Sequence, residues 1–239
     1  MGNALVLFSG GQDSTTCLLY AVTHYENVWT MGFSYGQRHT AEMVCRTDIL
    51  AELRSHKDYQ ERLRADCVLT LPNFSAIDTN ALTDPHQAIA EHNGLPTTFV
   101  PGRNILFLSY AAAYGYSRGI QTIVIGVGEA DYSGYPDCRQ ATCQAMEQAL
   151  SLGLDRPVRI ETPLMTKSKA ETFAYALELG GQWALDLIRK KTHTCYVNDR
   201  SHWHDFGYGC GECPSCRLRA KGWEEFCRSH VSECCKSKT

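Results

Sequence analysis

The sequence predicts an α/β protein of the Rossmann-like class, with a mostly parallel five-stranded sheet, helices on both faces and a small cysteine-rich C-terminal segment. Three observations carry this prediction. Apolar, strand-like runs alternate with helical patterns over the first 190 residues, which is typical of parallel sheets covered on both faces. The first apolar run passes through two glycines into a helical pattern. Seven of the twelve cysteines follow residue 190.

The expected strands and helices alternate in chain order. We expect strands at residues 4–8, 28–33, 67–71, 122–126 and 158–161, and helices at 14–25, 38–54, 103–118, 138–152 and 167–179. The crossovers should be right-handed. The polar, proline-bearing stretch 72–101 has weak periodicity and is typical of a lid or a disordered loop.

A change of composition after residue 190 predicts a boundary. We expect a nucleotide-binding unit at residues 1–190 and a second unit at 191–239. The second unit is rich in cysteine, glycine and histidine, with a short helix at 218–230 and frayed residues at 236–239.

Composition excludes several classes of protein. Of the 239 residues, 44% are hydrophobic and 21% charged, as in ordinary soluble domains. No apolar run is long enough for a membrane span and no secretory signal is evident, so we expect a cytoplasmic protein without a membrane partner. A net charge of −3 does not indicate a basic, nucleic-acid-binding face. The one dense basic cluster, Arg217–Lys221, suits a solvated helix face equally well.

The stretch "LFSGGQDSTTCL", Leu7–Leu18, carries the first functional signal. Glycines let the backbone turn sharply and bare its amides, and a helix N-terminus favours an anion at the same place. Asp13 or Ser14 also suits an N-cap, so a capped turn without a ligand is the plain alternative. A Walker A loop needs a lysine that is missing here, and the dinucleotide G-x-G-x-x-G spacing is absent.

The pattern S-G-G-x-D-S after a strand resembles the PP-loop of ATP pyrophosphatases. The resemblance implies an adenine nucleotide alpha hydrolase-like fold and cleavage of ATP to AMP and pyrophosphate, with Mg2+ neutralising the phosphates. It also implies that a serine, two glycines, an aspartate and a second serine hold the pyrophosphate. The nucleotide-binding positions are Phe8, Ser9, Gly10, Gly11, Gln12, Asp13, Ser14, Thr15, Thr16, Cys17 and Leu18.

The stretch "CGECPSC", Cys210–Cys216, spaces three cysteines as C-x-x-C-x-x-C, with Cys195 upstream. Four thiolates at this spacing predict one structural Zn2+ held by Cys195, Cys210, Cys213 and Cys216. Without an export signal, the cysteines are expected as thiols rather than disulfides. An iron–sulfur cluster, free thiols or a redox pair are the alternatives. The competing ligands are Cys227, Cys234, Cys235, His193, His202 and His204.

Several further motifs occur in one order along the chain. They are "YGQRH" (35–39), "TFVPGRNILFLS" (98–109), "DYSGYPDCR" (131–139), "ETPLM" (161–165) and "KAET" (169–172). Together with the glycine loop and the cysteines, they resemble the 7-cyano-7-deazaguanine synthase family of queuosine biosynthesis over residues 4–222. The resemblance implies a homodimeric ligase that turns 7-carboxy-7-deazaguanine and ammonia into a nitrile. The carboxylate is adenylated, ammonia gives an amide, and a second activation of the amide oxygen leads to the nitrile.

Candidate catalytic residues follow from matching motifs. We predict that Asp13, Arg103 and Lys169 act in catalysis. Arg103 opens a helix, where a guanidinium suits a phosphate or carboxylate, and Lys169 lies early in a helix where it could meet the phosphates. The plain alternatives are a surface cap contact for Arg103 and a solvated side chain for Lys169.

Candidate substrate contacts follow two of the expected strands, at the sheet edge where open α/β folds bind ligands. Arg38 or His39 after the second strand could reach phosphate or substrate. Acceptors that could read a guanine-like base are Glu129, Asp131 and Asp137, and Tyr132 and Tyr135 could stack on it. A polar loop around a glycine turn is the alternative.

Three rival functions remain to be separated. A tRNA-thiolating PP-loop enzyme would share the glycine loop but needs a basic RNA-binding face. A synthetase with its own glutaminase has no room in this chain, so free ammonia or ammonia from a partner is expected. A binding module with a decayed nucleotide site would not need the intact loop.

Overall fold

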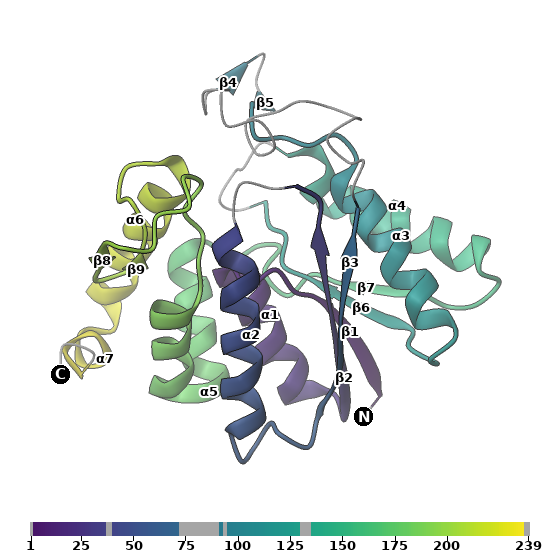
Figure 1. Cartoon of the computed structure of the whole chain (residues 1–239), viewed down its shortest axis with the longest axis horizontal. Coiled ribbons are helices and arrows are strands. Elements are labelled where there is room, and N and C mark those ends of the chain that lie inside the picture. The colour runs from purple at the N-terminus through teal and green to yellow at the C-terminus, as the bar shows by residue number, and fades with distance from the viewer. Residues whose placement is uncertain (1, 37–39, 72–90, 93–94, 130–134, 237–239) are drawn as a thin grey trace.

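The computed structural model describes residues 2–36, 40–71, 91–92, 95–129 and 135–236 (Figure 1). Its core is a five-stranded parallel sheet in the order β3-β2-β1-β6-β7. The strands are β1 (Asn3–Leu7), β2 (Asn27–Ser34), β3 (Leu63–Thr70), β6 (Thr122–Ile125) and β7 (Arg159–Glu161). The predicted fold class is therefore confirmed. Strand β3 begins four residues earlier than expected, because on this edge strand residues 64–66 are exposed and lack an apolar pattern.

Helices cover both faces of the sheet (Figure 1). One face carries α1 (Gln12–His24), α2 (Thr40–Ser55) and α5 (Lys169–Lys191), and the other carries α3 (Arg103–Tyr116) and α4 (Gln140–Gly153). Along β1, Ala4 and Val6 enter one apolar cluster, whereas Leu5 and Leu7 enter another. Because β1 is buried on both sides, it reads as a continuous apolar run rather than an alternating one.

Helix α5 extends well past the predicted end at residue 179. The chain kinks at Gly180 and Gly181, whose dihedral angles are not helical, and then continues as a second helical run to Lys191. Gly181 has φ of +63°, in the region that favours glycine. The glycine pair thus interrupts the helix, as its sequence indicates, without ending it.

The C-terminal segment packs against the sheet domain rather than apart from it. It contains β8 (Trp203–His204), β9 (Gly207–Tyr208), α6 (Pro214–Ser229) and α7 (Val231–Lys236). On α6, Trp223 and Phe226 pack against Phe173 of α5, with ring centroids 5.1 and 6.0 Å away, and they share its apolar cluster. The division at residue 190 stays a prediction from composition.

Helix α6 differs from its prediction at one end and on one face. It begins at Pro214, inside the cysteine motif, instead of residue 218. Within the basic cluster 217–221, Arg219 is 1% exposed and donates to the carbonyl oxygen of Ile188 at 2.8 Å. The basic cluster is therefore not uniformly a solvated face: one of its arginines joins α6 to α5.

Little of the stretch 72–101 belongs to the described residues. There β4 (Glu91–His92) pairs antiparallel with β5 (Leu95–Pro96). Whether the whole stretch acts as a lid stays a prediction. Within the described ranges, the structure has no helix with both the length and the apolar character to cross a membrane.

Candidate functional site

The glycine loop after β1 lies at the carboxyl edge of the sheet, where the strand order reverses between β1 and β6. Gly126 directly follows β6, and a methyl group built on it would lie 2.9 Å from the backbone carbon of Asp13. The absence of a side chain at Gly126 therefore lets the start of α1 approach the end of β6. Open α/β sheets bind ligands at such a switch point.

The backbone of the loop turns inward around the hydroxyl of Ser14. The amides of Ser9 and Gly10 donate to Ser14 Oγ at 3.2 and 3.3 Å. Gly10 has φ of +94°, and a methyl group there would lie 2.5 Å from the carbonyl oxygen of Glu42. Amides that converge on one oxygen form a concavity of the kind that receives phosphate oxygens.

The predicted N-cap is wrong. The N-cap of α1 is Gly11, without a side-chain capping bond, and Asp13 and Ser14 lie inside the first turn. The start of α1 therefore keeps amides that no side chain caps, which suits an anion better than a capped turn.

The predicted nucleotide stretch divides into a loop and its support. Ser9 is exposed and Asp13 partly exposed, so the mouth of the loop lies at these residues. Phe8, Cys17 and Leu18 are buried in the apolar core, and the hydroxyl groups of Thr15 and Thr16 donate to backbone carbonyl oxygens of the preceding turn. The side-chain amide of Gln12 is buried, and no described residue pairs with it.

Asp13 and Lys169 meet although they lie 156 residues apart. Lys169 Nζ contacts Asp13 Oδ1 at 2.8 Å and Oδ2 at 2.6 Å. Lys169 is the first residue of α5, where Ser168 and Glu171 form a reciprocal capping box. The cap fixes the start of α5, and hence the ammonium group, beside the glycine loop.

Arg103 opens α3 and turns toward the tyrosines that follow β2 and β6, not toward bulk solvent. Its guanidinium lies 3.4 Å from the hydroxyl of Tyr35 and 5.9 Å from the ring centroid of Tyr135. Burial alone would lower the pKa of Arg103, but the phenols of Tyr35 and Tyr135 and the carboxylate of Asp137 outweigh it and raise that pKa. A fixed, charged guanidinium therefore faces the sheet edge.

Two of the predicted substrate acceptors bind helix N-termini. Asp137 Oδ2 accepts from the amide of Asn104 at 3.0 Å and the residue is 5% exposed. Glu129 Oε1 accepts from the amide of Gln140, the first residue of α4, at 2.8 Å. Both carboxylates are thus engaged by the protein itself, and their contact with a substrate stays a prediction.

Tyr135 lies closer to the other predicted groups. Its hydroxyl pairs with Thr98 Oγ1 at 2.6 Å, and its ring faces Arg103. The predicted residues Arg38, His39, Asp131 and Tyr132 lie outside the described residues.

Two residues of α2 join the site although the sequence did not single them out. Glu42 places its carbonyl oxygen against Gly10 and its Oε1 3.4 Å from a methyl group built on Gly11. Arg46, 1% exposed, donates to the carbonyl oxygen of Phe8 at 2.7 Å and pairs with Asp66. The available signal was their spacing, since two charged residues at i and i+4 share one face of a helix.

The four predicted cysteines form one cluster. Their sulfur atoms lie within 4.8 Å of one another. The Cys210 and Cys216 sulfurs are 3.9 Å apart, close to the roughly 3.8 Å edge of a tetrahedron with zinc–sulfur bonds of about 2.3 Å. The thiols of Cys195 and Cys216 hydrogen-bond to Cys213 and hold the pKa of its thiol well below the usual value. The donor set therefore fits a thiophilic metal ion.

Backbone groups complete this centre. The amides of Glu212 and Cys213 donate to the Cys210 sulfur at 3.4 and 3.2 Å. A methyl group on Gly209 would lie 2.6 Å from the Cys216 sulfur. The link to the glycine loop lies two residues before Cys195, where the amide of His193 donates to the carbonyl oxygen of Gly10 at 3.2 Å. The cysteine cluster is therefore tied to the glycine loop through the backbone.

Other cysteines correct the expectation that thiols prevail throughout. Cys227 and Cys234 form a disulfide between α6 and α7. These two residues are therefore not ligands of the cluster. The nine described free cysteines include Cys17, whose pKa burial raises well above its usual value, with Asp13 adding to the effect.

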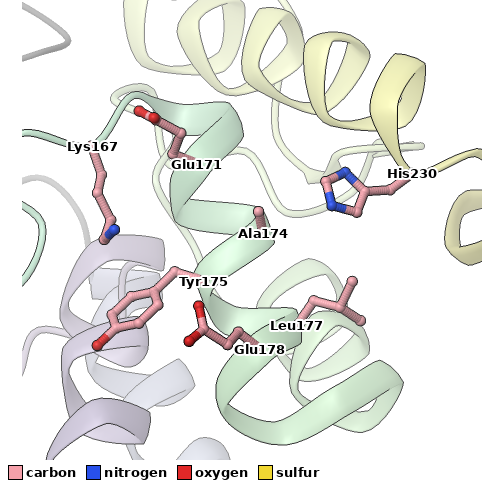
Figure 2. Close-up of a pocket in the computed structure, with 7 residues that line it drawn as sticks. All are labelled: Lys167, Glu171, Ala174, Tyr175, Leu177, Glu178 and His230. Atoms are coloured by element: carbon pink, nitrogen blue, oxygen red, sulfur yellow. The ribbon is translucent and has the colours of Figure 1, made fainter.

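One pocket of about 380 Å³ lies away from the glycine loop (Figure 2). It is formed by the outer face of α5 with Lys167 before it, and His230 after α6 points toward it. None of the predicted site residues lines it, and nothing in its mixed lining indicates a ligand.

The chain matches the family described as queuosine biosynthesis protein QueC over residues 3–227. It is 53% identical to 7-cyano-7-deazaguanine synthases of Rhodopseudomonas palustris and Nitrobacter hamburgensis and 49% identical to that of Lawsonia intracellularis. Each match covers 93% of this chain and 94% of the relative.

Among solved structures, a 4-thiouridine synthetase–RNA complex with bound ATP matches 78% of this chain and 42% of its own. The TM-score is 0.49 and the identity 17%, too distant to bear on the substrate. The family match spans the glycine loop, the sheet and the cysteine cluster alike. The chain belongs to the QueC family of queuosine biosynthesis proteins.

Proposed function

We propose that this protein converts 7-carboxy-7-deazaguanine and ammonia into 7-cyano-7-deazaguanine, using ATP as the activating substrate. The observation that supports this proposal most directly is the glycine loop at the switch point of the sheet. It occurs in a chain that is about 50% identical to 7-cyano-7-deazaguanine synthases over nearly their whole length. The protein would be a cytoplasmic homodimer that binds no nucleic acid.

The chemistry explains the need for two activations. A carboxylate is a poor electrophile, so its oxygen first attacks the α-phosphorus of ATP and pyrophosphate departs. Ammonia then displaces AMP to give the amide. The amide oxygen is adenylated in turn, and its loss as AMP leaves the nitrile. One phosphate-holding site serves both steps, because both activate an oxygen on the same carbon.

The residues of the loop take the phosphate-binding role. The uncapped N-terminus of α1 stabilises the charge of departing pyrophosphate, and the amides of Ser9 and Gly10 hold the Ser14 hydroxyl beside it. Lys169 and Arg103 add fixed positive charge on either side, with Asp13 holding the Lys169 ammonium in place. Mg2+ would supply further neutralisation of the phosphates.

Tyr135 and Asp137 are the described residues through which a guanine-like base would be recognised, with Glu129 beside them. Arg103 lies near the Tyr135 ring, which leaves a charged group where a carboxylate substituent needs a partner. The cluster of Cys195, Cys210, Cys213 and Cys216 would hold Zn2+ in a structural role, because all four positions of a tetrahedral ion are then filled by sulfur.

The test is one incubation of purified protein with ATP, Mg2+, ammonium and 7-carboxy-7-deazaguanine, followed by mass spectrometry and phosphate analysis. Nitrile together with AMP and pyrophosphate supports the proposal. Release of ADP and phosphate contradicts pyrophosphatase cleavage. ATP cleaved to AMP without nitrile contradicts the substrate, and RNA would be tested next.

A further inference from the structure

Glu42 is a carboxylate at the centre of the site that the proposed phosphate-binding residues do not use. It lies near the start of α2, and both of its ends face the glycine loop. Its carbonyl oxygen packs against Gly10, and Oε1 lies 3.4 Å from the point where a side chain of Gly11 would begin. Ser9 Oγ lies 3.3 Å from that same point. The carboxylate therefore stands next to the loop where the adenylate would form.

The titratable groups around Glu42 come from three helices. Asp13 of α1 and Arg103 of α3 both act on it, and Cys45 follows on α2 itself. Glu42 is only partly exposed, and burial raises its pKa to about 8; Arg103 opposes this shift and Asp13 adds to it. A carboxyl group with such a pKa exchanges protons near neutral pH.

The second carboxylate of the site is already occupied by an ammonium group. Lys169 Nζ binds both oxygens of Asp13 at 2.8 and 2.6 Å. The pair shows that an ammonium nitrogen is stabilised at this edge of the sheet. It also leaves Glu42, not Asp13, as the described carboxylate available to a second cation at the loop.

The proposed reaction needs a base at this place. Ammonium has no lone pair, so it cannot attack the acyl adenylate until it loses a proton. We propose that the Glu42 carboxylate accepts this proton, so that ammonia is generated beside the activated carbonyl carbon. This inference rests on the proposed function and names the residue that completes its second step.

Glu42 takes one proton from ammonium and becomes a carboxylic acid. The nitrogen lone pair forms the C–N bond, and the C–O bond breaks with its electron pair leaving on the AMP oxygen. The new nitrogen then releases a second proton, and both protons pass to solvent.

The experiment compares the native enzyme with Glu42→Gln, which keeps the shape but cannot accept the proton. Glu52→Gln is the matched control, because Glu52 lies on the same helix and pairs with Lys191 at the surface. Adenylation is measured alone by substrate-dependent exchange of pyrophosphate into ATP, without ammonium. Amide formation is then measured with ammonium and, separately, with hydroxylamine, which is neutral near pH 7 and needs no base.

We expect Glu42→Gln to retain exchange and hydroxamate formation within a few-fold, while its rate with ammonium falls by about 10²–10⁴. The deficit should shrink as the pH rises, because free ammonia then becomes abundant. Glu42→Asp should recover part of the ammonium rate, and Glu52→Gln should match the native enzyme throughout.

Three results would overturn the assignment. Equal losses with ammonium and hydroxylamine would mean that Glu42 does not act on the nucleophile. Loss of exchange would place Glu42 in ATP or Mg2+ binding, and an unchanged ammonium rate would exclude it as the base. If the native enzyme itself shows no exchange with 7-carboxy-7-deazaguanine, the proposed function fails and this assignment with it.

Discussion

At the scale of single residues, the site depends on charges that lie close together. Lys169 neutralises Asp13, Arg103 faces two tyrosines, and Glu42 lies beside the glycine loop. Each of the four comes from a different helix, so no local sequence pattern could show that they meet. Their separate roles can nevertheless be tested one side chain at a time.

Replacing Lys169 by Gln should weaken ATP binding without unfolding the protein. A hydrogen bond to a charged group contributes about 1.5–3 kcal/mol, so the KM for ATP should rise about 10- to 100-fold. The control is Lys167→Gln, because Lys167 lies over the ring of Tyr175 on the outer face. Similar KM values for the two variants would remove Lys169 from the nucleotide site.

Glu42 should also change how the free energy of unfolding depends on pH. Its pKa is raised from 4.5 to about 8 in the folded protein, so between these values the folded state binds more protons than the unfolded state. The native protein therefore loses stability as the pH rises through this window, whereas Glu42→Gln has no such loss.

The measurement is the free energy of unfolding in urea, for both proteins, across that range of pH. The stability of Glu42→Gln relative to the native protein should increase from pH 4.5 to about 8 and then level off. A difference that stays constant with pH would show that the Glu42 carboxyl titrates normally.

At the scale of elements, the sequence predicted the helices whose ends carry clear local signals. It misplaced the ends of helices that depend on packing. The Gly180–Gly181 pair is a strong local signal for a helix end. Helix α5 continues beyond it because the second half, Trp183 to Ile188, packs against the core. The first half of strand β3 was not predicted for the opposite reason. Residues 64–66 face solvent at the edge of the sheet and show no apolar pattern.

The kink in α5 predicts unequal costs for its two glycines. At Gly180 a methyl group would lie 2.7 Å from Ala184 Cβ and 3.0 Å from the hydroxyl of Tyr59, so Gly180→Ala should cost about 2–4 kcal/mol of stability. At Gly181 there is open space, but its φ of +63° and ψ of −157° lie in a region almost confined to glycine, so Gly181→Ala should cost about 1–3 kcal/mol. Urea unfolding of both variants checks this order. A cost at Gly181 that equals or exceeds the cost at Gly180 would contradict it.

At the scale of the whole molecule, the sequence predicted the parallel sheet, the loop at its centre and the four clustered cysteines. The sequence could not show which distant segments contact one another. Asp137 was predicted as a substrate acceptor from its polar motif, and that motif gave no sign that its carboxylate also binds the N-terminus of α3. Likewise nothing in the spacing of Cys227 and Cys234 distinguished a disulfide from two further thiols.

Because the cysteine cluster shares its core with α5, metal removal should affect the entire fold. We expect Cys213→Ser to lower the bound metal and to shift the single unfolding transition to lower urea, with exposure of Trp223, which is 6% exposed in the intact protein. Zinc analysis and tryptophan fluorescence provide the readouts. Cys227→Ser, outside the cluster, should keep its metal. Two separate unfolding transitions would contradict the shared core.

The hydrogen bond from His193 to Gly10 has a consequence for protein engineering. A chain shortened to the sheet domain would lose this bond and bare Phe173 and its neighbours to water. The cysteine segment is therefore unsuited to transplantation as a module, and a functional split of this protein would have to fall elsewhere along the backbone. In a fusion, a linker placed after residue 236 would leave both halves of the shared core intact.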